Sequence, residues 1–225
     1  MTKVIAFDVN ETLLDLSVLD EPFERLFGTA GLRPQWFSLA LQLLFVGGLT
    51  DSYVDFSTAQ HAALQMLARR ENVALTDDAA RETVALMSSL PPHPEVADAL
   101  GKLMSSPLRV VALTNSVEPV AEAQLRHAGI HNHFHRVISA DSVRRLKPAP
   151  EPYREVARMF GVALGDVRLV AAHSWDVTGA LRAGCKAAFV ARPGMVPSPI
   201  GPQPDIVASD IADAVDRILA VDVPS

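Results

Sequence analysis

The chain has 225 residues, of which 49% are hydrophobic and 20% charged, and its formal net charge is -6. This composition is typical of a globular protein with one large domain, or with one domain that carries an insertion. The negative charge argues against nucleic acid or an anionic membrane surface as a partner. The single cysteine, Cys185, excludes an intrachain disulfide, so a cytoplasmic location is the default expectation.

An apolar run at residues 4–7 ends abruptly at Asp8. A buried strand of a parallel α/β sheet reads as such a continuous run, and ligands bind beyond the carboxyl ends of the strands. We therefore expect a strand here, with Asp8 projecting into the crevice where a ligand would bind. The alternative is an Asx turn that merely ends the strand.

The next segment of the chain has the pattern of helices and contains no convincing strand. Helices are predicted over 21–27, from near Pro34 to Gly47-Gly48, from a Ser57–Gln60 capping box to about Arg70, and after the cap residue Thr76. The apolar stretch 37–49 is shorter than the ~20 residues that a membrane span needs, so it predicts a buried or interface helix and no membrane partner. The oligomeric state stays open, with a homodimer as one possibility.

Strands and helices alternate in the second half of the chain. The pattern predicts helices over 94–104, 117–127, 150–160 and 176–183, strands over 109–113, 136–139, 168–172, 187–190 and 206–207, and a terminal helix capped by Ser209. Such alternation indicates a doubly wound parallel sheet. We predict an α/β core formed by residues 1–15 and 96–225, with residues 16–95 as an all-helical insertion.

Three further segments place polar residues beside predicted strand ends or helix starts. Thr114 and Asn115 follow an apolar strand, Lys147 precedes a proline-rich helix start that includes Tyr153, and residues 173–176 read His-Ser-Trp-Asp. Taken singly, each has an ordinary structural explanation: a strand-end turn, a solvated lysine or a hydrogen-bonded histidine.

Taken together and in this order, the four segments resemble the motifs of the haloacid dehalogenase superfamily. The resemblance implies a Rossmann-like core, a covalent aspartate nucleophile at Asp8, and a helical cap formed by the insertion. Phosphatases of the superfamily carry a general acid at the position of Asn10, which an amide cannot replace. They also hold Mg²⁺ with two aspartates, where this chain has Ala172 and Asp176. The resemblance therefore favours the type II (L-2-haloacid) dehalogenases, which need no metal or other cofactor.

The resemblance also implies roles for individual residues. Lys147 would keep Asp8 ionised, and Thr12 would brace the Asp8 loop. Asp176, with His173, would activate water for the hydrolytic step. The remaining residues predicted to contact the substrate, a small 2-haloacid, are Asn10, Trp36, Phe37, Phe56, Thr114, Asn115, Tyr153 and Trp175.

Three of these positions depart from the type II pattern. Phe37 stands where the family grips the leaving halide with an arginine, His173 replaces an asparagine, and Asn10 replaces an aromatic residue. Two alternatives stay open: a Mg²⁺-dependent phosphatase of a small phosphorylated metabolite, and a non-catalytic binding protein. His131, His133 and His135 are interpreted as a surface turn rather than as a metal tract.

Overall fold

The computed structural model describes residues 2–223 and contains a six-stranded sheet in which every neighbouring pair is parallel. The order of the strands is β3-β2-β1-β4-β5-β6. Their bounds are β1 Val4–Phe7, β2 Arg109–Thr114, β3 Arg136–Ser139, β4 Val167–Ala171, β5 Lys186–Val190 and β6 Ile206–Ala208. The predicted parallel α/β sheet is thus confirmed.

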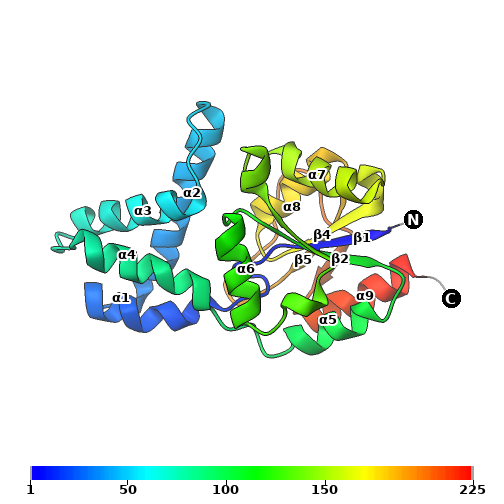
Figure 1. Ribbon diagram of the computed structural model, residues 1–225, viewed down its shortest axis with the longest axis horizontal. Coiled ribbons are helices and arrows are strands. Elements are labelled where there is room, and N and C mark those ends of the chain that lie inside the picture. The colour runs from blue at the N-terminus through cyan, green and yellow to red at the C-terminus, as the bar shows by residue number, and fades with distance from the viewer. Residues whose placement is uncertain (1, 224–225) are drawn as a thin grey trace.

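Helices cover both faces of the sheet, which makes it doubly wound (Figure 1). Successive side chains of a strand point to opposite faces, so Ile5 and Phe7 pack in one apolar cluster while Val4 and Ala6 pack in another. The first cluster includes residues of α5 (Val96–Met104), α6 (Glu118–His127) and α9 (Ile211–Asp222), and the second those of α7 (Pro150–Phe160) and α8 (Ser174–Ala183).

A block of helices lies beside the sheet rather than on its faces (Figure 1). It contains α1 (Asp20–Phe27), α2 (Arg33–Leu49), α3 (Phe56–Arg70) and α4 (Asp77–Ala85), with the short 3-10 helices η1 (Leu16–Leu19), η2 (Ala30–Leu32) and η3 (Leu86–Ser89). Further 3-10 turns in the α/β part are η4 (His131–His133), η5 (Ala140–Val143) and η6 (Leu164–Asp166).

Two predicted helix caps differ from those in the structure. Helix α3 begins after Asp55, whose carboxylate accepts a hydrogen bond from the Thr58 amide at 3.0 Å, rather than at a Ser57 capping box. Helix α9 begins after Asp210 rather than after Ser209. In both cases an aspartate, whose ionised side chain is a stronger acceptor than a hydroxyl at a positive helix N-terminus, takes the cap.

The position of β1 determines where a site can form. Strand β1 lies between β2 and β4. The chain therefore builds the sheet outward from β1 in two directions, first through β2 and β3 and then through β4, β5 and β6. Crevices in doubly wound sheets open at such a switch point, beyond the carboxyl ends of the strands. Asp8 follows β1 directly, Thr114 ends β2, and His173 follows β4. No helix within residues 2–223 has the length and apolar character that crossing a membrane requires.

Candidate active site

Lys147 and Asp8 meet at this switch point although 139 residues separate them. Both are buried, with the Lys147 side chain fully enclosed. The Nζ atom of Lys147 donates to Asp8 Oδ1 at 2.8 Å, to Asp176 Oδ2 at 2.6 Å and to the Leu113 carbonyl oxygen at 2.8 Å. Three acceptors therefore fix the ammonium between two carboxylates.

The charges of this cluster decide the protonation of Asp8. Burial on its own would raise the pKa of Asp8, but the charge of Lys147 and the hydrogen bond and charge of His173 hold it well below its usual range. Burial would likewise lower the pKa of Lys147, but Asp176 and Asp8 raise it. Asp8 is thus an ionised carboxylate at neutral pH, which is the form a nucleophile needs.

The second oxygen of Asp8 is held by two other side chains. Thr12 Oγ1 donates to Asp8 Oδ2 at 2.7 Å and itself accepts from the Ala172 amide at 2.9 Å. The Nδ1 atom of His173 lies 3.0 Å from the same oxygen. The carboxylate is therefore fixed in one orientation before any ligand binds.

Asp176 braces Lys147 rather than facing open space. Its Oδ2 accepts from Lys147, and its Oδ1 accepts from Tyr153 Oη at 2.5 Å. Tyr153 approaches closely because Gly179 has no side chain, since a Cβ there would lie 2.7 Å from Tyr153 Oη. Burial raises the pKa of Asp176 against the opposing charge of Lys147. Asp176 is fully buried, so its placement suits the positioning of Lys147 better than the predicted contact with water.

The loop that carries Lys147 is held by Asn115. The Asn115 side chain accepts from the Lys147 amide at 2.8 Å and donates to the Lys147 carbonyl at 3.1 Å. This two-point contact fixes the backbone from which the ammonium projects. Asn115 also lines the cavity beside Asp8, so it can both support Lys147 and contact a ligand.

The cavity beside Asp8 is small, with about 10 Å³ open to water, which is about what one water molecule requires. Of the residues predicted to contact substrate, Asn10, Phe37, Phe56, Thr114, Asn115 and Trp175 line it, together with Asp8, Leu41 and His173. Tyr153 reaches the cluster only through Asp176.

Two predicted contact residues have hydrogen-bond partners that do not line the cavity. Trp36 lies in the core of the helical block, where it packs on Phe23 and donates from Nε1 to the Gln60 carbonyl at 2.8 Å, and it does not line the cavity. Asn10 lines the cavity, but its side-chain oxygen accepts from Gln124 at 2.9 Å. Asn10 therefore ties the Asp8 loop to α6.

Two charged residues of the cluster were not predicted from the sequence. Glu11 Oε2 lies 2.9 Å from Nε2 of His173, on the side of the ring away from Asp8. Arg192 donates from its NH2 group to the Thr12 carbonyl at 2.9 Å and pairs with Glu95 at 2.7 Å. Their positions alone could have pointed to them, because Glu11 lies within the first motif and Arg192 follows an apolar strand.

The donor set does not suit Mg²⁺, which prefers carboxylate oxygens and waters in an octahedron. Both oxygens of Asp176 already accept from Lys147 and Tyr153, and Asn10 and Ala172 supply no carboxylate. Among residues 2–223, no group of three or more His, Cys, Asp or Glu side chains is arranged to hold a metal ion. His131 belongs to the turn η4 and pairs with Glu122 at 2.7 Å.

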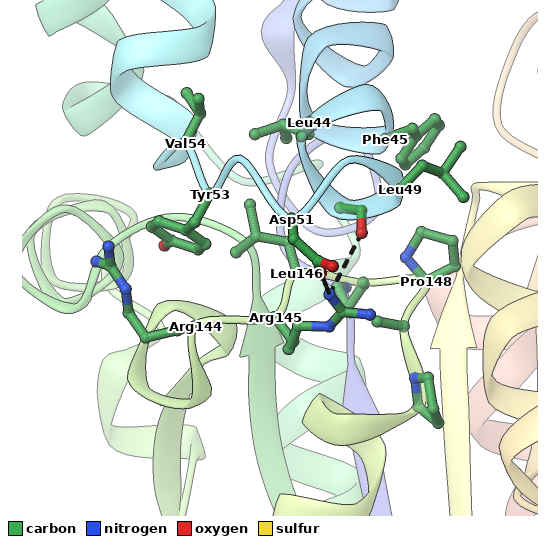
Figure 2. Close-up of a pocket in the computed structure, with 15 residues that line it drawn as sticks. Leu44, Phe45, Leu49, Asp51, Tyr53, Val54, Arg144, Arg145, Leu146 and Pro148 are labelled. Carbon is green, nitrogen blue, oxygen red and sulfur yellow. Dashed lines mark hydrogen bonds and ion pairs between the residues drawn. The ribbon is translucent and has the colours of Figure 1, made fainter.

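A second cavity, of about 480 Å³, lies at the seam between α2 and the loop that leads to Lys147 (Figure 2). Arg145 crosses this seam, donating to Asp51 at 3.1 Å and to the Gly48 carbonyl at 3.3 Å. Tyr53 crosses it too, hydrogen bonding to Asp141, while the Arg144 guanidinium lies 3.7 Å from the centre of the Tyr53 ring. These contacts hold the helical block against the α/β part.

Comparison with known proteins places this arrangement in a family. A profile of haloacid dehalogenase-like hydrolases matches residues 2–184. The (S)-2-haloacid dehalogenase of Pseudomonas sp. (strain YL) is 28% identical over 217 residues, covering 95% of this chain and 93% of the relative. That of Xanthobacter autotrophicus is 28% identical over 194 residues, covering 85% and 76%.

The structural likeness is closer still. The L-2-haloacid dehalogenase of Xanthobacter autotrophicus, solved with chloropropionic acid covalently bound, superposes with a TM-score of 0.92 at 25% identity, over 98% of this chain and 100% of the other. The sequence of this chain thus matches one family over most of its length. The same chain has the sheet order, the helical block and the buried aspartate–lysine pair described above. The chain belongs to the haloacid dehalogenase-like hydrolases.

Proposed function

We propose that this hydrolase displaces halide from a small 2-haloacid through an ester formed on Asp8. The observation that carries the proposal is the Asp8 carboxylate, which is buried in contact with Lys147 and lies beside a cavity with aromatic walls. Similarity to enzymes named (S)-2-haloacid dehalogenases, one of them solved with a covalently bound acid, supports this substrate class.

The proposed reaction has two steps. An oxygen of Asp8 attacks the carbon that bears the halogen, the carbon inverts, and halide leaves with the bonding electrons. Water then adds to the carboxyl carbon of Asp8, the bond to the ester oxygen breaks, and the 2-hydroxy acid departs. One proton of the water ends on the product hydroxyl and the other goes to solvent. Thr12 and Lys147 hold the Asp8 carboxylate, and Asp176, Tyr153 and Asn115 position Lys147.

The departing halide needs a partner, because Phe37 stands where the family's arginine would. The indole Nε1 of Trp175 is buried and has no hydrogen-bond acceptor within the described part of the chain. An unpaired buried donor costs about 1–3 kcal/mol, so an anion beside it would be stabilised. Trp175 lines the same cavity as Asp8, and we include it in the proposal as a donor to the halide.

Residues 16–95 are proposed to act as a cap that opens and closes. The cavity beside Asp8 holds about one water, so a haloacid fits only if α2 moves away from the strand ends or its side chains rearrange. Closing over the substrate would then exclude water during the first step and strengthen the electrostatic interactions inside. A homodimer, with its contacts unassigned, is compatible with this proposal.

Turnover is expected to be independent of metal. After exhaustive treatment with EDTA, the rate of halide release from 2-chloropropionate should stay within experimental error of the untreated rate, because Lys147 supplies the cation that neutralises Asp8. Ion chromatography of released halide measures this, with p-nitrophenyl phosphate as the comparison substrate. Activity on the phosphate ester that is lost on chelation and restored by Mg²⁺ would favour the phosphatase instead.

Replacing Phe37 by arginine is expected to raise the turnover of chloroacetate, by on the order of tenfold. Phe37 is nearly buried, lines the cavity and stacks on His173 with ring centres 6.0 Å apart. A guanidinium there would add a charged hydrogen bond to the leaving halide, typically worth about 1.5–3 kcal/mol, reduced by the cost of burying the charge. Phe37→Leu is the matched control, and steady-state kinetics with a thermal melt of each variant are the measurements. Unchanged kinetics in a normally folded Phe37→Arg would place position 37 outside the reaction.

A further inference from the structure

The imidazole of His173 lies between two carboxylates, only one of which belongs to the nucleophile. Its Nδ1 lies 3.0 Å from Asp8 Oδ2, and its Nε2 lies 2.9 Å from Glu11 Oε2. The aromatic rings of Phe37 and Trp175 pack against it, with ring centres 6.0 and 5.2 Å away. A buried ring whose two nitrogens both face anionic acceptors is held in one position and in one charge state.

The surroundings of His173 favour the charged imidazolium. Asp8 and Glu11 contact it directly, Arg33 lies behind Glu11 at 3.7 Å, and Lys147 and Asp176 lie behind Asp8. Burial alone would lower the pKa of His173, but its hydrogen bonds to Asp8 and Glu11 and their charges raise it to about 10. Both nitrogens therefore act as donors at neutral pH, and neither has a lone pair with which to accept a proton from water.

The hydrogen bonds also distinguish the two oxygens of Asp8. Oδ2 accepts from Thr12 and from His173, whereas Lys147 is the one donor to Oδ1 among residues 2–223. A carboxylate oxygen has about two lone-pair sites, so Oδ2 is saturated and Oδ1 keeps one site for attack. Oδ1 then becomes the ester oxygen, and Oδ2 remains as the carbonyl oxygen of the ester.

We propose that His173, together with Thr12, stabilises the oxyanion that forms on Asp8 Oδ2 during ester hydrolysis, and that Glu11 is the positioning residue that holds His173. This inference rests on the proposed function. As the water oxygen bonds to the carboxyl carbon, an electron pair moves onto Oδ2, directly opposite two donors that are already in place. The pair returns when the bond from the carbon to Oδ1 breaks and the product leaves. Donors arranged in advance around a developing oxyanion are a main source of catalysis.

The surroundings of His173 distinguish stabilisation of the oxyanion from two other roles, which are binding of the halide and general-base catalysis. Halide leaves on the side of the carbon opposite to the attacking oxygen, whereas Nδ1 of His173 faces Asp8 itself, so His173 does not bind the halide. A general base would need a free lone pair, which the imidazolium lacks. His173 therefore orients the Asp8 carboxylate before attack and, as a donor to the oxyanion, is assigned to the second step.

Pre-steady-state kinetics with bromoacetate separate the two steps. The parent enzyme should release halide with no initial burst, because it hydrolyses the ester as fast as the ester forms. Halide release by the parent tests the proposed function. His173→Phe keeps a ring against Phe37 and removes both donors, so it should release one halide per site quickly and then hydrolyse the ester on the order of 10²–10³ times more slowly. Intact-protein mass spectrometry should show the ester accumulating, and mass spectrometry after proteolysis should assign it to the peptide that contains Asp8.

Glu11→Gln provides the second variant, because it keeps the shape of the side chain and removes one of the two anions that hold His173. Loss of that anion lowers the pKa of His173, so the ring loses its proton within an accessible pH range. If His173 is a donor, the ester-hydrolysis rate of Glu11→Gln falls as pH rises, by on the order of tenfold when the charged hydrogen bond becomes neutral. If His173 is a base, that rate rises with pH.

The controls make each result decisive. Glu82→Gln removes an exposed glutamate elsewhere in the helical block and should behave like the parent. In a double variant, Glu11→Gln with His173→Phe, the ester-hydrolysis rate should no longer fall as the pH rises, because the titrating ring is absent. The inference is overturned if the parent turns over while His173→Phe loses the halide burst, or if Glu11→Gln hydrolyses the ester faster at higher pH. It is also overturned if both single variants keep the parent rate. A parent that releases no halide at all refutes the proposed function itself.

Discussion

Replacing Asp8 by alanine or asparagine is expected to lower halide release by on the order of 10⁴-fold or more, as removal of a covalent nucleophile does in other enzymes. Asp8→Asn is the sharper variant, because the amide has nearly the same shape but is a far poorer nucleophile than a carboxylate. Asp98→Asn, which changes an exposed aspartate of α5, is the matched control and should keep the parent rate.

Isotope labelling tests the chemistry of Asp8 directly. In a single turnover in H₂¹⁸O with enzyme in excess, the solvent oxygen should enter the peptide that contains Asp8, because water adds to the carboxyl carbon of Asp8. The product hydroxyl should stay largely unlabelled, since its oxygen comes from Asp8. If Asp8 instead activated water for direct attack on the substrate, the product would be labelled and the peptide would not. Mass spectrometry of the peptide and of the hydroxy acid distinguishes the two.

Lys147→Met should be the most disruptive substitution for folding as well as for activity. It leaves Asp8 and Asp176 buried without their shared cation, and removing one partner of a buried ion pair typically costs about 3–5 kcal/mol. Urea denaturation measures this cost. Lys102→Met, which breaks the exposed pair with Asp216, should cost no more than about 1 kcal/mol. A Lys147→Met protein as stable and as active as the parent would remove the lysine from the mechanism.

The sign of the pH effect follows from the pKa of Asp8. In the parent this pKa lies below its unfolded value, so the ionised group contributes stability above the unfolded pKa and loses it as the pH falls toward the folded one. Without Lys147 the folded pKa rises. The acid limb of the pH–rate profile of Lys147→Met should therefore move to higher pH, and less of the protein's stability should be lost on acidification.

The sheet and the polar residues at its carboxyl edge were predictable because both depend on a regular pattern. Apolar runs that end in polar residues mark the carboxyl ends of β1, β2 and β4, and in a parallel sheet those ends meet at one edge. Lys147 has no such local signal: a lysine before a proline is ordinarily solvated, and only the family resemblance placed it beside Asp8.

The position of Trp36 could not be read from the sequence for a different reason. Helix α2 carries no charged residue after Arg33, and apolar residues occur all around it. Such a helix has no distinct apolar stripe to show which side faces inward. Neighbouring residues therefore divided between two environments, with Phe37 beside Asp8 and Trp36 against Phe23.

Glu11 shows a further limit of sequence analysis, because its role depends on an unusual backbone conformation. Its φ is 61°, in the left-handed region that glycine adopts readily and a glutamate rarely does. Residues held there cost of order 1–3 kcal/mol. The backbone and the side chain therefore make opposite demands at this one position. Glycine would relieve the backbone strain, but it would leave the buried His173 without one of its two anionic partners and Arg33 without Glu11.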